Sequence, residues 1–173
     1  MAPVSTLVTL ISTSPVPIPA PELAPGYSVR PLDHSDVAEM GRLYFESYPP
    51  SVACANLEAA TTDIRASFHG DYGELWWEAS PVVTHSTGLA AAIMTVHRGP
   101  WEGTPGCPFV IEVFTDHAHR RRGLARALLV DCLRTTSSAG EPSVALRVDP
   151  ANTAATALYE PLGFVLWEGG AQR

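Results

Sequence analysis

Apolar residues recur along this chain with two periods, one typical of helices and one typical of strands. Residues 27–30 alternate apolar and polar side chains, as a half-buried strand does. Residues 37–44 and 57–68 each keep their apolar groups on one helical stripe, and Gly70 is placed to end the second stripe. The first part of the chain therefore predicts one strand followed by two helices.

The remaining pattern alternates strands with helices. It predicts, in order, strands at 75–83 and 89–96 that form a hairpin, a strand at 109–115, a helix at 124–133, a strand at 144–148, a helix at 152–162 and a strand at 164–167. Strands interleaved with helices in one run indicate an α/β (α+β) domain, which we expect over residues 27–173.

Residues 1–26 differ from the rest of the chain because prolines interrupt them repeatedly. Proline lacks a backbone N–H and fixes φ, so such a segment favours extended structure without regular hydrogen bonding. We expect a proline-rich N-terminal extension outside the domain, either mobile or bound to a partner. The prolines are Pro3, Pro15, Pro17, Pro19, Pro21 and Pro25.

Composition limits the class of protein. The 173 residues, 46% of them apolar and 17% charged, suit a single domain, and a net charge of −7 argues against nucleic-acid binding. Cys54, Cys107 and Cys132 lack the spacing of a zinc site, so we expect reduced thiols and no metal. Neither a secretory signal nor a membrane-spanning run is evident, which favours a cytoplasmic protein without membrane contact.

Residues 120–125 read Arg-Arg-Arg-Gly-Leu-Ala and join the strand at 109–115 to the helix that follows. Gly123 allows close backbone approach, and the first turn of a helix offers unpaired N–H groups and the positive end of its dipole. Arginines at the same place add positive charge to this anion site. Three consecutive arginines taken alone indicate a solvated loop, but their position between strand and helix favours phosphate binding.

This segment resembles the Gln/Arg-x-x-Gly-x-Gly/Ala signature of the GNAT acetyltransferases. Residues 146–164 are similar to the second signature of that family, with Asn152 after a strand, Tyr159 on a helix, and then Gly163 and Phe164. The resemblance implies a central mixed, mostly antiparallel sheet with helices on both faces. It also implies that a β-bulge splays the strands at 109–115 and 144–148 apart.

The resemblance further implies that acetyl-CoA binds in that gap, with its pyrophosphate at the arginine loop. An acetyl group would then pass directly to a primary amine of a small molecule or peptide within a ternary complex. Asn152 matches a position that approaches the cofactor arm, although it suits a helix N-cap equally well. The implied cofactor-binding residues are Val113, Phe114, Thr115, Arg120, Arg121, Arg122, Gly123, Leu124, Ala125, Arg126, Asn152, Ala155 and Tyr159.

Glu112 is the candidate general base. An alkylammonium with a pKa near ~10.4 must lose a proton before it attacks a thioester, so a nearby base is useful. Strand alternation would put Glu112 on one side with Val110 and Phe114, so a solvent-facing carboxylate would expose both apolar side chains. We therefore interpret Glu112 as facing a cleft. His97, His117 and His119 are competing candidates.

Tyr159 matches the family position that protonates the departing CoA thiolate, a step that a phenol with a pKa near ~10 can perform. The alternative is a packed tyrosine anchored by one hydrogen bond. Trp76, Trp77 and Trp101 could line an acceptor pocket, but tryptophans more often belong to a core or an interface. The negative net charge favours a cationic acceptor.

Two further points stay open at the level of sequence. Little chain follows Phe164, so the last strand that the family usually adds is missing, very short, or exchanged with a second protomer in a homodimer. A non-catalytic acyl-CoA-binding module is the alternative to an enzyme, and Tyr159 in register weighs against it.

Overall fold

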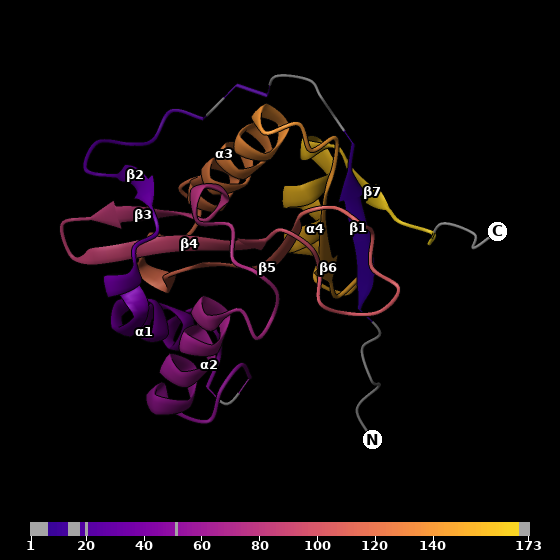
Figure 1. Ribbon diagram of the computed structural model, residues 1–173. Helices are drawn as coiled ribbons and strands as arrows, with labels where there is room; N and C mark the ends of the chain where they lie inside the picture. The colour runs from indigo at the N-terminus through magenta and orange to yellow at the C-terminus, as the bar shows by residue number, and fades with distance from the viewer. Residues whose placement is uncertain (1–6, 14–17, 20, 51, 170–173) are drawn as a thin grey trace.

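One mixed β-sheet organises the part of the chain that the structure describes (Figure 1). The structure is a computed structural model and describes residues 7–13, 18–19, 21–50 and 52–169. Its strands are β1 (Val8–Ser12), β2 (Ser28–Pro31), β3 (Pro81–His85), β4 (Gly88–Val96), β5 (Phe109–Thr115), β6 (Val144–Val148) and β7 (Phe164–Leu166). They lie in the order β2-β3-β4-β5-β6-β1-β7, and among these described strands the β5–β6 pair alone is parallel.

Helices cover both faces of this sheet, as predicted. They are α1 (Val37–Ser47), α2 (Leu57–His69), α3 (Leu124–Ser138) and α4 (Thr153–Tyr159). Helices α1 and α2 pack on one face, where Met40 and Leu43 are fully buried, and α3 packs on the other through Leu128 and Leu129 (Figure 1). Two apolar layers, one on each side of a mixed and mostly antiparallel sheet, confirm the α/β (α+β) class.

Several predicted boundaries agree closely with the structure because local signals set them. Gly70 caps α2 in the left-handed conformation with φ of 90°, and its N–H bonds the carbonyls of the last turn. The strands at 109–115 and 144–148 have the predicted bounds. Helix α3 is longer than predicted and continues to Ser138, because its last polar turns lie beyond the apolar stripe.

The predicted strand at 75–83 is wrong in its first half. A 3₁₀ turn at Trp77–Ala79 interrupts it, and the N–H of Ala79 bonds the carbonyl of Trp76. The turn sends the two tryptophans to the opposite faces of the sheet, so β3 begins only at Pro81. An apolar run without breakers does not reveal such a turn, because burial on both faces also produces it.

The expected N-terminal extension is also wrong for its described part. Strand β1 lies within the sheet and pairs antiparallel with both β6 and β7 (Figure 1). Leu10 is 9% exposed and joins the main apolar cluster, and Ile18 and Leu23 pack against the same cluster as the chain returns past α3. The strand is therefore part of the domain, and Pro3, Pro15 and Pro17 of the predicted arm lie outside the described residues.

Strand β1 also bears on the predicted shortage of strands at the C-terminal end. The place between β6 and β7 is occupied by β1 of the same chain, which none of the three predicted possibilities included. Backbone hydrogen bonds that a lone β7 would lack are supplied by β1, including one from the N–H of Trp167 to the carbonyl of Thr9 at 2.9 Å. Within the described residues, the helices are too short or too polar to cross a membrane.

Strands β5 and β6 touch only at their beginnings. Their parallel pairing joins Phe109 to Ala145 and Val110 to Leu146, and it ends there. The ladder between β4 and β5 shifts register at Met94 and Thr95, so one residue of β5, Ile111, stands opposite no partner. A bulge of this kind bends the bulged strand, and here it accompanies the separation of β5 from β6. The predicted splay is thus present.

Candidate active site

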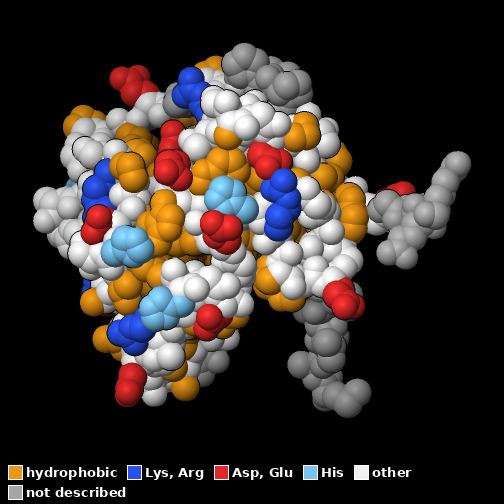
Figure 2. All heavy atoms as spheres, viewed as in Figure 1, with side chains coloured by type: hydrophobic (Ala, Val, Ile, Leu, Met, Phe, Trp, Pro, Cys, Tyr) orange, Lys and Arg blue, Asp and Glu red, His pale blue; other side chains and the backbone are white. Residues whose placement is uncertain are grey.

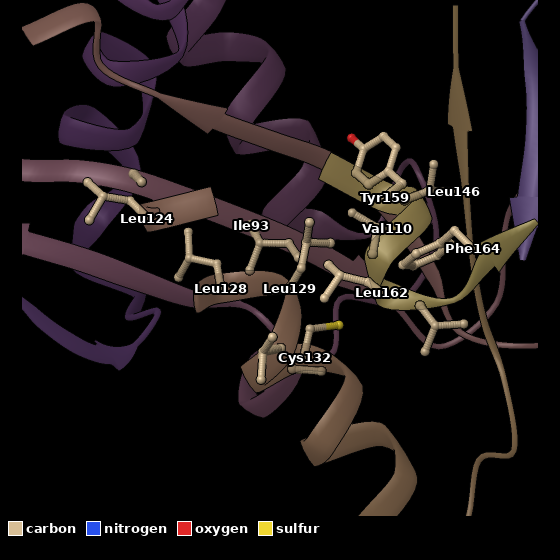
Figure 3. Close-up of a cluster of buried hydrophobic side chains, with 14 of the residues drawn as sticks. Ile93, Val110, Leu124, Leu128, Leu129, Cys132, Leu146, Tyr159, Leu162 and Phe164 are labelled. Carbon is tan, nitrogen blue, oxygen red and sulfur yellow. The ribbon is translucent and has the colours of Figure 1, made fainter. Parts of the chain in front are cut away.

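A cavity of about 1030 Å³ opens where β5 and β6 separate. Its walls come from β5, β6, the start of α3, α4 and the end of α1. Tyr159 reaches it from the edge of the packed cluster, and Figure 3 shows its phenol oxygen pointing away from that cluster. The predicted site residues on the wall are Glu112, Val113, Phe114, Thr115, Arg120, Arg121, Gly123, Leu124, Ala125, Arg126, Asn152, Ala155 and Tyr159. One long binding space therefore contains nearly the whole predicted set.

The N-terminus of α3 is uncapped and open at one end of this cavity, which are the features of an anion site. Gly123 precedes the helix with φ of 74°, and a Cβ added there would have no atom within 4 Å, so open space faces its backbone. The first helical hydrogen bond runs from Ala127 to the carbonyl of Gly123, and Gly123 offers no side-chain cap. The N–H groups of the preceding turn are consequently available to phosphate oxygens.

Arg121, in the same loop, has an unusual backbone conformation. Among the described residues it is the one non-glycine with positive φ, at 62°. A left-handed backbone is costly for a residue with a Cβ and persists where the surroundings enforce it, often at a binding site. Arg121 and Gly123, the two residues of this loop with positive φ, both line the cavity.

The arginines of the loop have different surroundings. Arg120 lies on the cavity wall, but its guanidinium donates hydrogen bonds to the carbonyls of Ser47 and Thr115, which tie the loop to the end of α1 and to β5. Arg122 does not line the cavity, because its guanidinium stands over the ring of Tyr27 at 6.0 Å. Arg121 and Arg126 also lie on the cavity wall. Within the described chain their guanidinium groups make no hydrogen bond, ion pair or ring contact.

Glu112 enters the middle of the cavity from β5, beside Tyr44 of α1 and Tyr48, the residue that follows this helix. The hydroxyl of Tyr48 donates to its Oε2 at 2.9 Å, and that of Tyr44 approaches Oε1 at 3.5 Å. The pKa of Glu112 is raised to about 7, mainly by burial; the hydrogen bonds from Tyr48 and Tyr44 oppose the rise, and the nearby charge of Asp63 adds to it. A carboxyl group with a pKa near neutrality can take up and release a proton at physiological pH.

Val110 and Glu112 lie on opposite faces of β5, whereas the predicted alternation put them on the same face. Val110 packs in the cluster under α3, whereas Phe114 packs in the cluster under α1 and α2. The extra residue at Ile111 moves everything after it to the opposite face, so Glu112 shares a face with Phe114 but not with Val110. The predicted alternation is therefore wrong for Val110, although the Glu112 carboxylate does face a cavity.

Tyr159 lies at the end of α4, 6% exposed, with its ring against Phe164. Within the described chain its hydroxyl has no hydrogen-bond partner, so the anchored-tyrosine alternative lacks its expected anchor. Burial and then the charge of Glu112 raise the pKa of Tyr159 to about 12. The phenol therefore keeps its proton at neutral pH and can donate it within the cavity.

Asn152 is the N-cap of α4, as predicted, and its approach to a cofactor arm stays a prediction. Its side chain caps α4 by accepting a hydrogen bond from the N–H of Ala155 at 3.1 Å, and it also lines the cavity. Of the competing histidines, His119 lines the cavity and meets the hydroxyl of Tyr27 at 2.8 Å, whereas His97 stacks on Trp76 at 4.4 Å, away from it. His117 is exposed and is absent from the wall.

The acetyltransferase (GNAT) family model matches residues 37–164, which is most of the chain and includes the loop, both splayed strands, Glu112 and Tyr159. The chain belongs to the GNAT acetyltransferase family. Within the curated proteins, a mycothiol acetyltransferase of Thermobispora bispora is 46% identical over 66 residues, which cover 38% of this chain and 22% of that protein. The chain thus matches about a fifth of this relative.

Solved structures agree with the GNAT fold. A GCN5-related N-acetyltransferase of Sphaerobacter thermophilus superposes with a TM-score of 0.68 at 20% identity, over 93% of this chain and 48% of that one. The aminoglycoside N-acetyltransferase AAC(6')-Iy in complex with CoA gives 0.62 at 18% identity, over 85% and 93% of the two chains. At these identities the likeness establishes the shared fold.

Sequence reasoning missed the contribution of α1 and the segment after it to this GNAT cavity. Tyr44, Ser47 and Tyr48 line the wall, followed by Val52 and Ala53. Two tyrosines four positions apart near a helix end were a usable signal, because that spacing puts both rings on one side. The three tryptophans once considered for the acceptor pocket do not line it: Trp76 and Trp77 pack on the sheet, and Trp101 contacts Phe109 and Arg147.

Proposed function

We propose that this protein transfers an acetyl group from acetyl-CoA to a primary amine of a small molecule or peptide. The observation that carries the proposal is a single cavity with an anion-binding helix start at one end and both Glu112 and Tyr159 on its wall. Family membership over residues 37–164 supports the same chemistry. The acceptor's identity is left to experiment.

Acetyl-CoA fits this cavity in its charge and in its shape. The pyrophosphate would meet the backbone N–H groups after Gly123 and the guanidinium groups of Arg121 and Arg126. The pantetheine arm would lie between β5 and β6, where backbone groups beyond Val110 and Leu146 have no strand partner across the gap. An amide-bearing chain can pair with such groups as a further strand would.

The amine must lose a proton before it attacks, and the thiolate must gain one as it leaves. Each of these two steps has a candidate residue. Removing the proton of an ammonium group with a pKa of about 10.4 costs about 4–5 kcal/mol at pH 7. In our proposal Glu112 accepts that proton, and the amine nitrogen attacks the thioester carbonyl carbon. The carbon–sulfur bond then breaks, and the departing thiolate takes the proton of the Tyr159 hydroxyl. The acylated nitrogen gives up its second proton, which restores that hydroxyl directly or through water, and Glu112 releases the first proton to solvent. The products are an amide and free CoA.

The proposal includes further expectations about partners, location and oligomeric state. Figure 2 shows acidic and basic side chains interspersed over the visible face, and the expected lack of nucleic-acid binding stays a prediction. A cytoplasmic location, the absence of membrane contact and a possible homodimer also stay predictions. A sedimentation measurement of the purified protein would decide the last of these.

Calorimetric titration with acetyl-CoA tests the cofactor site. We expect saturable binding by the wild type and at least tenfold weaker binding by Gly123→Glu, because the new carboxylate would occupy the phosphate space. Gly140→Glu is a matched control: Gly140 also has positive φ, at 89°, and open space around it, but it lies beyond the other end of α3. Both variants suffer the same backbone strain, and only the first should lose acetyl-CoA.

The same proteins then test catalysis. The chain contains no lysine, so acetyl transfer to an added amine is not obscured by acetylation of its own lysines. Release of CoA that depends on the amine supports the enzyme. Tight acetyl-CoA binding without turnover on any amine would favour the non-catalytic acyl-CoA-binding module, and failure of the wild type to bind would contradict both readings.

A further inference from the structure

Tyr48 joins the end of α1 to the carboxylate of Glu112. It follows the last residue of the helix in an extended conformation, with φ of −112° and ψ of 153°, and this turn brings its ring onto the cavity wall. Its hydroxyl donates to Oε2 of Glu112 at 2.9 Å, and its ring meets that of Tyr44 edge-on at 5.4 Å. A short hydrogen bond and a ring contact therefore fix its orientation.

The backbone beside Tyr48 is fixed from the opposite side of the cavity. The guanidinium of Arg120 donates to the carbonyl of Ser47, and its Nε donates to the carbonyl of Thr115 at 3.3 Å. Arg120 belongs to the loop that precedes α3. The end of α1 is thus held to the end of β5 while the next residue holds the carboxylate in the middle of that strand.

We propose that Tyr48 is a positioning residue for acetyl transfer: its hydroxyl orients Glu112 and favours the carboxylate form that can accept a proton. The inference rests on the proposed function, because it assigns Glu112 as the base. A carboxylate in a low-dielectric cavity tends to become protonated, and a hydrogen bond donated to it favours the charged form. A charge-assisted bond of this length also restricts the carboxylate's rotation.

The groups around Glu112 make Tyr48 the main source of this effect. The longer contact from Tyr44, at 3.5 Å, is at the limit of hydrogen bonding and is weaker. Asp63 on α2 carries a negative charge that opposes ionisation of Glu112. The remaining titratable neighbours, Cys54 and Tyr159, have raised pKa values and are neutral near pH 7.

The test is the pH dependence of kcat/KM for Tyr48→Phe, which keeps the ring and removes the hydroxyl. Without this donor the pKa of Glu112 rises, so the rising limb of the profile should move to higher pH. Near pH 7 we expect kcat to fall roughly tenfold or more, because a hydrogen bond to a charged group is lost. Tyr44→Phe removes the longer contact to the same carboxylate and is the graded comparison: it should move the rising limb in the same direction by a smaller amount.

Two further measurements separate positioning from a general loss of structure. Acetyl-CoA binding by Tyr48→Phe should equal that of the wild type, since the hydroxyl faces the base and not the phosphate loop. In a Glu112→Gln background, adding Tyr48→Phe should cost little further activity, because the base on which it acts is absent. A fall in activity that is equal at every pH, or weakened acetyl-CoA binding, would overturn the proposal.

These outcomes also distinguish the inference from the function on which it rests. If the wild type binds acetyl-CoA and acetylates an amine while Tyr48→Phe has an unchanged profile, the positioning role is refuted and the function stands. If the wild type neither binds nor transfers, the proposed function itself fails. A shifted profile with intact binding supports both.

Discussion

Glu112 carries an ionisable carboxyl group in an enclosed position, where the charged form is disfavoured. Its pKa is raised to about 7, mainly by burial, although two tyrosines donate hydrogen bonds to it. Desolvation therefore outweighs the hydrogen bonds at this residue. Such a group lowers the stability of the fold whenever it ionises, so activity and stability are opposed at this position.

Glu112→Gln should stabilise the protein at high pH and not at low pH. Below the ordinary carboxyl pKa of about 4.3 the side chain is neutral in both the folded and unfolded states, so the variant gains nothing. As pH rises toward 7 the unfolded chain ionises first, and the wild type loses up to about 3 kcal/mol. Above pH 7 the difference is constant. Urea unfolding at pH 4.5, 6 and 8 measures it.

Glu102→Gln is the control for that series. Glu102 is exposed in the loop before β5, and the same chemical change there should leave the free energy of unfolding unchanged at all three values of pH. An equal gain for Glu112→Gln at pH 4.5 and pH 8 would contradict burial of the charge as the cause.

At the scale of elements, β5 and β1 decide the shape of the cavity and the integrity of the sheet. The bulge at Ile111 turns Glu112 toward α1 and separates β5 from β6. Strand β1 holds the other side of β6 through antiparallel pairing along its full length. One wall of the cavity thus depends on residues that are distant in sequence from the family's signatures.

Leu10→Ala should reduce the free energy of unfolding by about 2–5 kcal/mol, as truncation of a buried leucine does. Leu10 packs in the main cluster from β1, whereas Leu7, just before the strand, is 55% exposed. Leu7→Ala is therefore the matched control and should have little effect. Urea unfolding followed by fluorescence compares them, and an equal, small effect of both variants would mean that β1 does not hold the sheet in solution.

At the scale of the whole molecule, an acidic protein carries a local concentration of positive charge. The formal net charge is −7, yet residues 120, 121, 122 and 126 are all arginines, four of the eleven basic residues. An anionic cofactor is attracted to the arginines, while the remaining surface repels it and attracts cations. The distribution suits a reaction between an anionic donor and a cationic acceptor.

A matched pair of acceptors tests that charge argument. 1,4-Diaminobutane and 4-amino-1-butanol have similar length, but the first carries a second positive charge. We expect several-fold higher kcat/KM for the diamine at low salt, and a loss of that advantage as salt rises, because screening shortens the reach of surface charge from about 10 Å at 0.1 M to about 3 Å at 1 M. Initial rates of CoA release measure both. A salt-independent ratio would contradict long-range attraction.

The family, the fold class and the start of α3 at Gly123 could be predicted because they depend on local patterns. Gly123 at a strand-to-helix junction determines an anion site from neighbouring residues alone. The end of α2 at Gly70 and the bounds of β5 are equally local, since a left-handed cap or an unbroken apolar run reveals them. These features survive in the sequence because each needs only residues that are adjacent along the chain.

Tertiary structure alone decided the rest. The bulge at Ile111 set the face of Glu112, because register depends on pairing with β4 and not on the strand's own alternation. Placement of β1 required pairing between residues more than 130 positions apart, which composition could not indicate in a proline-rich segment. Tyr48 became a partner of Glu112 only when α1 packed on the sheet. Sequence determined which chemical groups are present, and long-range packing determined which of them meet.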